Sequence, residues 1–144
     1  MVRNIGALVV GVLTLGLVVL TLQQVSTALH PLPEGLDPFA PEDAEAFAAH
    51  MEGMPTAAWV VAMLSEVLGA FLGALATGWI GRSAARPLSS VIVGVALAGS
   101  VANWTAFTHP TWFIGAQLIL YPGALMLVWL LIDQRPPAEA EGRS

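Results

Sequence analysis

The sequence predicts an all-α membrane protein: a four-transmembrane-helix bundle with a short amphipathic helix in the periplasmic loop between helices 1 and 2. Hydrophobic residues make up 56% of the 144 residues and charged residues 10%, with a mean hydropathy of +0.75. This composition lies outside the soluble globular class. Four apolar runs reach the roughly 20 residues that a helix needs to cross a bilayer. They place the predicted spans at residues 5–27, 58–81, 88–107 and 112–132.

The first predicted span has a signal peptide as its alternative. Arg3 can act as a charged n-region, and Ser26-Thr27-Ala28 can act as a small-x-small cleavage site. The apolar run is longer than the roughly 7 to 15 residues of a typical h-region. We therefore predict a retained helix.

Residues 28–56 are predicted to form an extracytoplasmic loop that contains a helix over residues 41–52. The prolines before Pro41 prevent regular structure, Pro41 suits a first helical turn, and Gly53 followed by Pro55 ends the helix. One face of this helix is acidic and the other is apolar, with Ala44, Phe47, Ala48 and Met51 on the apolar face. Anionic lipid prefers basic helices, so we expect a lid over the bundle.

Glu66 is the one charged residue inside the second apolar run. It shares a helical face with small residues, among them Gly69 and Gly73, and Gly99 lies on the small face of the third span. Small residues let helices approach closely, within one chain or between copies. The opposite face of the second span should meet lipid; it carries Val60, Val61, Leu64, Val67, Leu68, Phe71, Leu72 and Leu75.

Charge segregation predicts the topology. Six of the ten acids lie between the first two runs, whereas the five arginines lie elsewhere, at Arg3, Arg82, Arg86, Arg135 and Arg143. The positive-inside rule then places both termini in the cytoplasm and the acidic loop outside. No basic face for nucleic acid exists, and the absence of cysteine excludes disulfides, thiolate metal sites and cysteine catalysis.

Two further features accompany this topology. The tail over residues 136–144, rich in Pro and Glu, is predicted to be cytoplasmic and disordered. The five tryptophans are interpreted as anchors at the two membrane interfaces rather than as a ligand box.

Polar side chains gather in the half of the predicted bundle nearest the acidic loop. They are Gln23, Gln24, Glu66, Asn103, Gln117 and Tyr121. In one interpretation Glu66 is protonated or hydrogen-bonded to Asn103, Gln117 or Tyr121, and the cluster fixes helix register. In the other, the cluster lines a wet vestibule for a proton, cation or small polar ligand. We favour the first, because the inner half offers no polar path beyond Thr77 and Ser89.

Histidines supply weak candidates for a metal site. His30, His50 and His109 all fall on the predicted outer side, where Asp37 or Glu34 can complete a zinc site. No two of them have a metal-binding spacing such as H-x-x-x-H, so we predict no metal and no cofactor. No Ser, His and Asp set at one depth and no phosphate-binding glycine loop is present, which argues against an enzyme.

A set of short motifs resembles an uncharacterised family of small four-span bacterial integral membrane proteins. The motifs are HPLPEGLDP, a short acidic helix ending at Met54-Pro55, ExxGAFxGA from Glu66 to Ala74, Asn103, HPxWF from His109, and Tyr121-Pro122. The resemblance implies bacterial origin and four spans, and it lends no catalytic residues.

The sequence therefore predicts a non-enzymatic protein of the bacterial cytoplasmic (inner) membrane. It is expected to act in the lipid bilayer by helix-mediated interaction, as a homo-oligomer or as an accessory subunit of a larger membrane complex. The alternative is a small transporter or channel that uses Glu66. A membrane enzyme with its site under the periplasmic lid is the third hypothesis.

Overall fold

The computed structural model describes residues 2–134, and within them it is helical with no strand. The long helices are α1 (Val2–Leu29), α3 (Thr56–Ile80), α4 (Ala85–Ala106) and α5 (Thr111–Asp133). The short helix α2 (Ala44–Glu52) follows a 3-10 turn at Pro41–Asp43, and a second 3-10 turn, Arg82–Ala84, precedes α4. The predicted fold class is confirmed. The predicted disordered tail, residues 136–144, lies outside the described residues.

Four of the helices are long and apolar enough to cross a membrane. Large apolar side chains cover their outer surfaces; on α1, Leu13, Leu17 and Leu20 are all exposed. Exposure of such an apolar surface to water is unfavourable in free energy, whereas its contact with lipid tails is not. The chain is a multi-pass membrane protein whose helices contact the bilayer.

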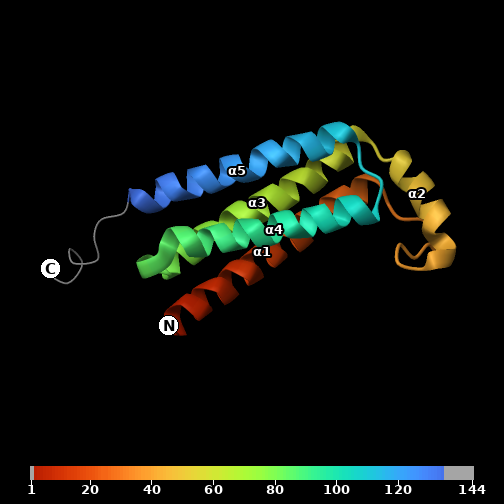
Figure 1. The fold of residues 1–144 in the computed structure, drawn as a ribbon. Coiled ribbons are helices and arrows are strands. Elements are labelled where there is room, and N and C mark those ends of the chain that lie inside the picture. Colours follow the sequence, from red (N-terminus) through yellow and green to blue (C-terminus); the bar gives the residue numbers. More distant parts are fainter. Residues whose placement is uncertain (1, 135–144) are drawn as a thin grey trace, which may run out of the picture.

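Helix α3 is the centre of the bundle and packs against α1, α4 and α5, most extensively against α1 (Figure 1). Its glycines make this packing close: a Cβ built on Gly73 would lie 2.6 Å from the carbonyl oxygen of Gly11, and one on Gly69 would lie 2.8 Å from Cγ2 of Val19. The predicted Gly69 and Gly73 motif therefore joins two helices of the same chain.

Gly99 does not pack against another helix of its own chain, contrary to that part of the prediction. Gly99 is exposed, and a Cβ built on it would meet nothing within 4 Å. The inward face of α4 instead carries Ser89, Ile92, Val93 and Ser100. Successive residues point about 100° apart around a helix. The predicted inward face of α4 was therefore rotated by about one residue, because Ser100 faces inward and Gly99 outward.

The predicted lipid face of α3 is too broad. Leu64, Leu68 and Leu72 are exposed at 40–42%, but Val67, assigned to the same face, is buried at 8% exposure. The central position of α3 explains the difference, because helices cover it on several sides and leave one narrow stripe for lipid.

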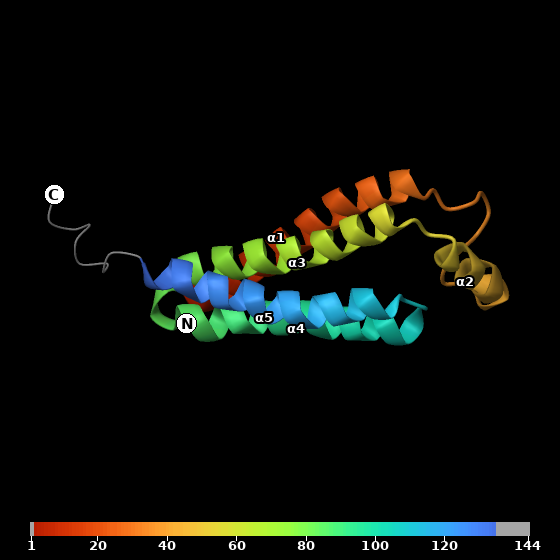
Figure 2. The ribbon, with the colours of Figure 1, turned by 90° about the horizontal axis from the view of Figure 1, so that it is seen from above.

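The bundle opens toward one end. In Figure 2 the α1/α3 pair and the α4/α5 pair diverge toward the end that carries α2, which we call the lid end. At the opposite end, the turn end, an apolar core that includes Ala74, Ile92 and Val128 fills the bundle. There the side chains of Arg86 and Asp133 form an ion pair that joins α4 to α5.

The short helix α2 lies at the lid end and contacts the bundle through a few side chains. Its Phe47 ring packs edge to face on Phe107, with centroids 5.2 Å apart, and its His50 ring stacks on His30 at 3.9 Å. Gly53 and Pro55 then separate α2 from α3. The helix is thus placed as a lid over the mouth of the bundle.

Candidate functional site

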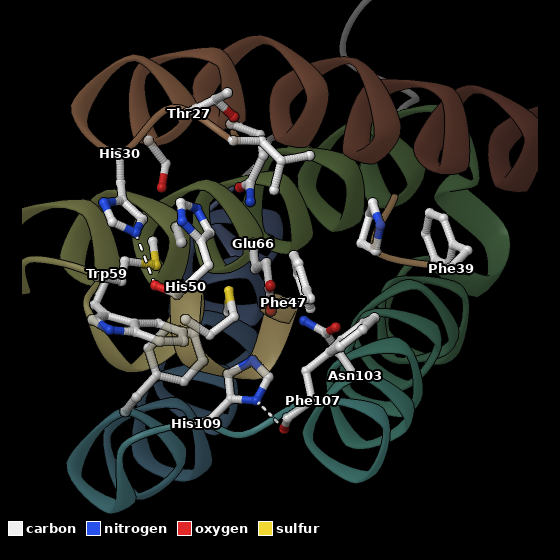
Figure 3. Close-up of a pocket in the computed structure, with 18 residues that line it drawn as sticks. Thr27, His30, Phe39, Phe47, His50, Trp59, Glu66, Asn103, Phe107 and His109 are labelled. Carbon is white, nitrogen blue, oxygen red and sulfur yellow. Dashed lines mark hydrogen bonds between the residues drawn. The ribbon is translucent and has the colours of Figure 1, made fainter. Parts of the chain in front are cut away.

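A cavity of about 350 Å³ lies beneath α2 and extends to Glu66 (Figure 3). We call it the vestibule. Each part of the lid end contributes to its walls: Gln23, Ser26 and Thr27 from α1; Phe47, His50 and Met51 from α2; Trp59, Ala62 and Glu66 from α3; and Asn103, Phe107, His109 and Phe113 from α4, α5 and their connection.

The Glu66 side chain lies at the deep end of the vestibule and has two unlike oxygens. Its Oε2 accepts hydrogen bonds from Ser100 Oγ at 2.7 Å and Gln117 Nε2 at 2.7 Å, and Tyr121 OH lies 3.5 Å away. Its Oε1 accepts none from residues 2–134, yet it is not among the enclosed polar atoms that lack a partner. Oε1 therefore remains accessible.

A second layer of hydrogen bonds holds these donors. The Ser100 hydroxyl has one hydrogen, and it donates that hydrogen bond to Glu66. In the 2.6 Å contact between Ser100 Oγ and Tyr121 OH, the tyrosine is therefore the donor. The indole Nε1 of Trp104 donates to Gln117 Oε1 at 2.8 Å. Gln117 and Tyr121 are almost fully buried. Their geometry is set by packing, and it directs neutral donors at one oxygen of the acid.

A second cavity, of about 580 Å³, lies between α1 and α4. We call it the lateral groove. Leu15 and Val19 of α1 line one side, and Val95 and Gly99 of α4 line the other. Glu66, Asn103 and Phe107 line both this groove and the vestibule, so the two cavities meet at the acid.

The structure brings Glu66, Gln117 and Tyr121 into contact, places Asn103 and Gln23 in the wall of the same cavity, and leaves Gln24 outside. Asn103 lines the cavity without bonding to Glu66. Gln23 also lines it and accepts a hydrogen bond from Ser65 Oγ at 3.1 Å. Gln24 is exposed outside the cluster, and its assignment is wrong, because adjacent helical residues point about 100° apart.

Three contributors were missed. Ser100 bridges Glu66 and Tyr121 and is 4% exposed. A serine in an apolar helix usually donates to a backbone carbonyl of its own helix, as Ser90 Oγ does to that of Arg86. Nothing in the sequence therefore distinguishes Ser100 as a partner of Glu66. The interfacial interpretation is wrong for Trp59, which is 5% exposed and lines the vestibule. Trp104 is half-buried and adds a bond to Gln117 that the sequence did not predict.

The three histidines line the same vestibule. His30 Nε2 donates to the backbone carbonyl of His50 at 2.9 Å, and His109 Nδ1 donates to that of Phe107 at 2.8 Å. Burial, together with the nearby His30, lowers the pKa of His50 from 6.5. Among residues 2–134, no three His, Asp or Glu side chains gather into a metal-binding group.

The polar lining stops at Glu66. Toward the turn end, Thr77 Oγ1 donates to the carbonyl oxygen of Ala7 at 3.1 Å, and Ser89 Oγ donates to that of Ala74 at 2.9 Å. Both hydroxyls are buried and serve helix packing. Within residues 2–134, the two described cavities at Glu66 thus belong to the lid-end half of the bundle.

Comparison of the sequence with protein-family models, with curated proteins and with solved structures found no match.

Proposed function

We propose that the protein binds a small ligand in the vestibule, with the Glu66 carboxyl as its principal polar contact. One observation carries the proposal: the vestibule reaches an acid whose Oε2 is saturated by neutral donors while Oε1 stays accessible. An acid that served only to join helices would have both oxygens enclosed by partners, because a bare carboxyl oxygen in a membrane protein is costly.

The site suits binding better than conduction through one chain. Polar groups lead from the lid end to Glu66, and beyond it the core is apolar, with Ile92 and Val128 almost fully buried. A transporter would need a second conformation that opens the turn end. The discriminating measurement is proton or cation flux in liposomes: if Glu66→Gln leaves flux, stability and assembly all unchanged, the transport alternative fails.

We place no reaction at this site. The hydroxyl nearest the acid, that of Ser100, is buried and is engaged as donor and acceptor at once. A nucleophile must reach its substrate, and this one is enclosed. Binding is therefore a better account than the enzyme hypothesis.

The proposal includes an orientation and a setting. Arg3, Arg82 and Arg86 lie toward the turn end, and the acidic loop lies at the lid end. By the positive-inside rule the vestibule then opens to the periplasm of a bacterium, and both termini are cytoplasmic. Membership of the four-span bacterial family belongs to the same proposal.

Cysteine accessibility tests whether the vestibule is open to water. The chain has no native cysteine, so Asn103→Cys, beside Glu66, and Val128→Cys, in the apolar core, give single-thiol proteins. A charged, membrane-impermeant methanethiosulfonate reagent should modify Asn103→Cys and leave Val128→Cys unmodified. Equal protection of both thiols would mean that the cluster is closed and structural.

Helix-mediated assembly is the second candidate. The Gly69 and Gly73 face is occupied by α1, but α4 leaves Gly94, Ala98 and Ala102 exposed along one side. Small residues spaced by four allow close helix contact between copies. Crosslinking of Ala98→Cys in membranes tests this: a disulfide dimer supports assembly through α4, and a monomer argues against it.

A further inference from the structure

We propose that the ligand is an amphiphilic organic cation, whose ammonium group occupies the vestibule and whose apolar chain leaves through the lateral groove. This inference rests on the proposed binding function and adds the chemical class of the ligand. Three observations carry it: the charge of the lid end, the aromatic walls, and the junction of the two cavities.

Charge at the lid end favours a cation. The segment over residues 28–56 contains six acids and no Lys or Arg. Among residues 2–134, neither cavity has a Lys or Arg in its lining, and Glu66 is the one acid that lines both. A cleft with charge of one sign concentrates ligands of the opposite sign. Here the charge is negative, so the site attracts cations and repels anions.

The vestibule walls favour an organic ammonium over a metal ion. Trp59 packs edge to face on Phe113, with centroids 5.2 Å apart, and Phe47 does so on Phe107 at 5.2 Å. Aromatic faces attract ammonium groups, most strongly when water is excluded. In Figure 3 Phe47 lies beside Glu66, with Trp59 on one side of the cavity and Phe107 on the other. Metal ions would need several oxygen or nitrogen ligands, and residues 2–134 gather no such group.

The lateral groove supplies space for a chain. It begins at Glu66 and Asn103 and runs between Leu15 and Val19 on α1 and Val95 and Gly99 on α4, and its lining is largely apolar. Gly99 has open space where a Cβ would be. The glycine predicted to pack helices thus leaves room in the groove. A phospholipid fits less well, because its phosphate would lie beside Glu66 with no basic side chain to compensate.

Binding is measured on the full chain in maltoside micelles by quenching of tryptophan fluorescence. The probes are tetramethylammonium and octyltrimethylammonium, with octyl sulfate as the anionic probe and dihexanoyl phosphatidylcholine as the phospholipid probe. We expect octyltrimethylammonium to bind at least about tenfold more tightly than tetramethylammonium, because burial of methylene groups is favourable.

Two variants separate head from chain. Glu66→Gln should weaken both ammonium probes by about tenfold or more, since the negative charge that attracts the quaternary nitrogen is lost. No atom lies within 4 Å of a Cβ built on Gly99, so a leucine there fits without a clash and fills the groove. Gly99→Leu should therefore remove the gain in affinity from the octyl chain and leave tetramethylammonium binding unchanged. Gly115→Leu, at an exposed glycine of α5 that also has nothing within 4 Å of a built Cβ and lies outside both cavities, is the matched control and should change neither.

Three outcomes would overturn the inference: octyl sulfate or the phospholipid binding as tightly as octyltrimethylammonium, no gain from the octyl chain, or Gly99→Leu behaving like Gly115→Leu. Failure of the proposed function is distinguishable from these. If Asn103→Cys resists the thiol reagent, binding in the vestibule fails altogether; if it reacts and the chain-length effect is absent, the ligand class alone is wrong.

Discussion

Glu66 has two oxygens in different surroundings, and this difference gives the site its character. Oε2 receives short bonds from Ser100 and Gln117, while Oε1 stays accessible. Directed donors hold the carboxyl in one orientation without neutralising it, since both are uncharged. The acid can therefore offer a fixed acceptor to a ligand that enters the vestibule.

Ser100→Ala should destabilise the bundle by about 1 kcal/mol, the size of an interhelical hydrogen bond in a membrane protein, because it removes the link between Tyr121 and Glu66. Ser90→Ala is the control on the same helix, since Ser90 bonds only to the backbone of its own helix. Unfolding in mixed micelles measures the free energy. Equal stability of the two variants would contradict a connecting role for Ser100.

His50 should make the lid sensitive to pH. Its pKa in the folded protein is lowered by burial and by His30, so the opened lid binds protons more readily than the closed one. Closure is fully stable above about pH 6.5, the ordinary histidine pKa, and weakens as the pH falls through it. After correction for its intrinsic pH dependence, hydrogen exchange of α2 amides should accelerate from about pH 7.5 to about pH 5.5, two assay conditions about one unit either side of that value.

The control for this pH effect is His50→Gln, which cannot titrate. Its α2 exchange, after correction for the intrinsic pH dependence of amide exchange, should be flat over the same range. If the wild-type protein is also flat, the stacked His30 and His50 pair does not govern the lid.

At the scale of helices, close contact between α1 and α3 holds the bundle together. Gly11 of α1 lies against Thr77 and the carbonyl oxygen of Gly73, which leaves no room for a side chain. Gly16, one turn and a half further along α1, has nothing within 4 Å of a built Cβ. Spacing along the first run does not distinguish these glycines, and only one of them packs.

Gly11→Ala should therefore lower stability by about 1 to 3 kcal/mol, the usual effect of overpacking, because backbone atoms of α3 cannot move aside. Gly16→Ala should be neutral or slightly stabilising, since alanine favours helix more than glycine does. Unfolding of both variants in the same micelles checks this pair. A neutral Gly11→Ala would mean that α1 and α3 can separate without loss.

For the whole molecule, the splay of the helix pairs makes one end open and the other closed. The apolar core around Ile92 and Val128 fills the turn end, while α2 and the acidic loop cover the vestibule at the lid end. Such asymmetry suits a protein that accepts a ligand from one side of the membrane, as proposed above.

Orientation in the membrane can be measured with two single cysteines in exposed positions, Ala46→Cys on α2 and Ser83→Cys in the turn before α4. An impermeant maleimide added to intact bacterial cells should label Ala46→Cys at once, and Ser83→Cys only after the cells are opened. The reverse pattern would place the vestibule in the cytoplasm and contradict the positive-inside assignment.

The sequence by itself determined the class of the fold, the four spans, the short helix before the second span, and Glu66 as the unusual residue. Apolar runs, proline positions and an isolated charge are properties of the chain alone, and they were enough. Gln117 and Tyr121 were identified because they are large polar groups in an apolar run.

Only the tertiary structure decided which side chains meet. Ser100 rather than Asn103 binds Glu66, Gln24 and Gly99 face outward, and Trp59 and Trp104 turn inward. The physical reason is rotation: each residue turns a helix by about 100°, and the angle at which a helix settles depends on its neighbours. Periodicity defines the faces of a helix, whereas packing against the other helices selects the face that lines the site.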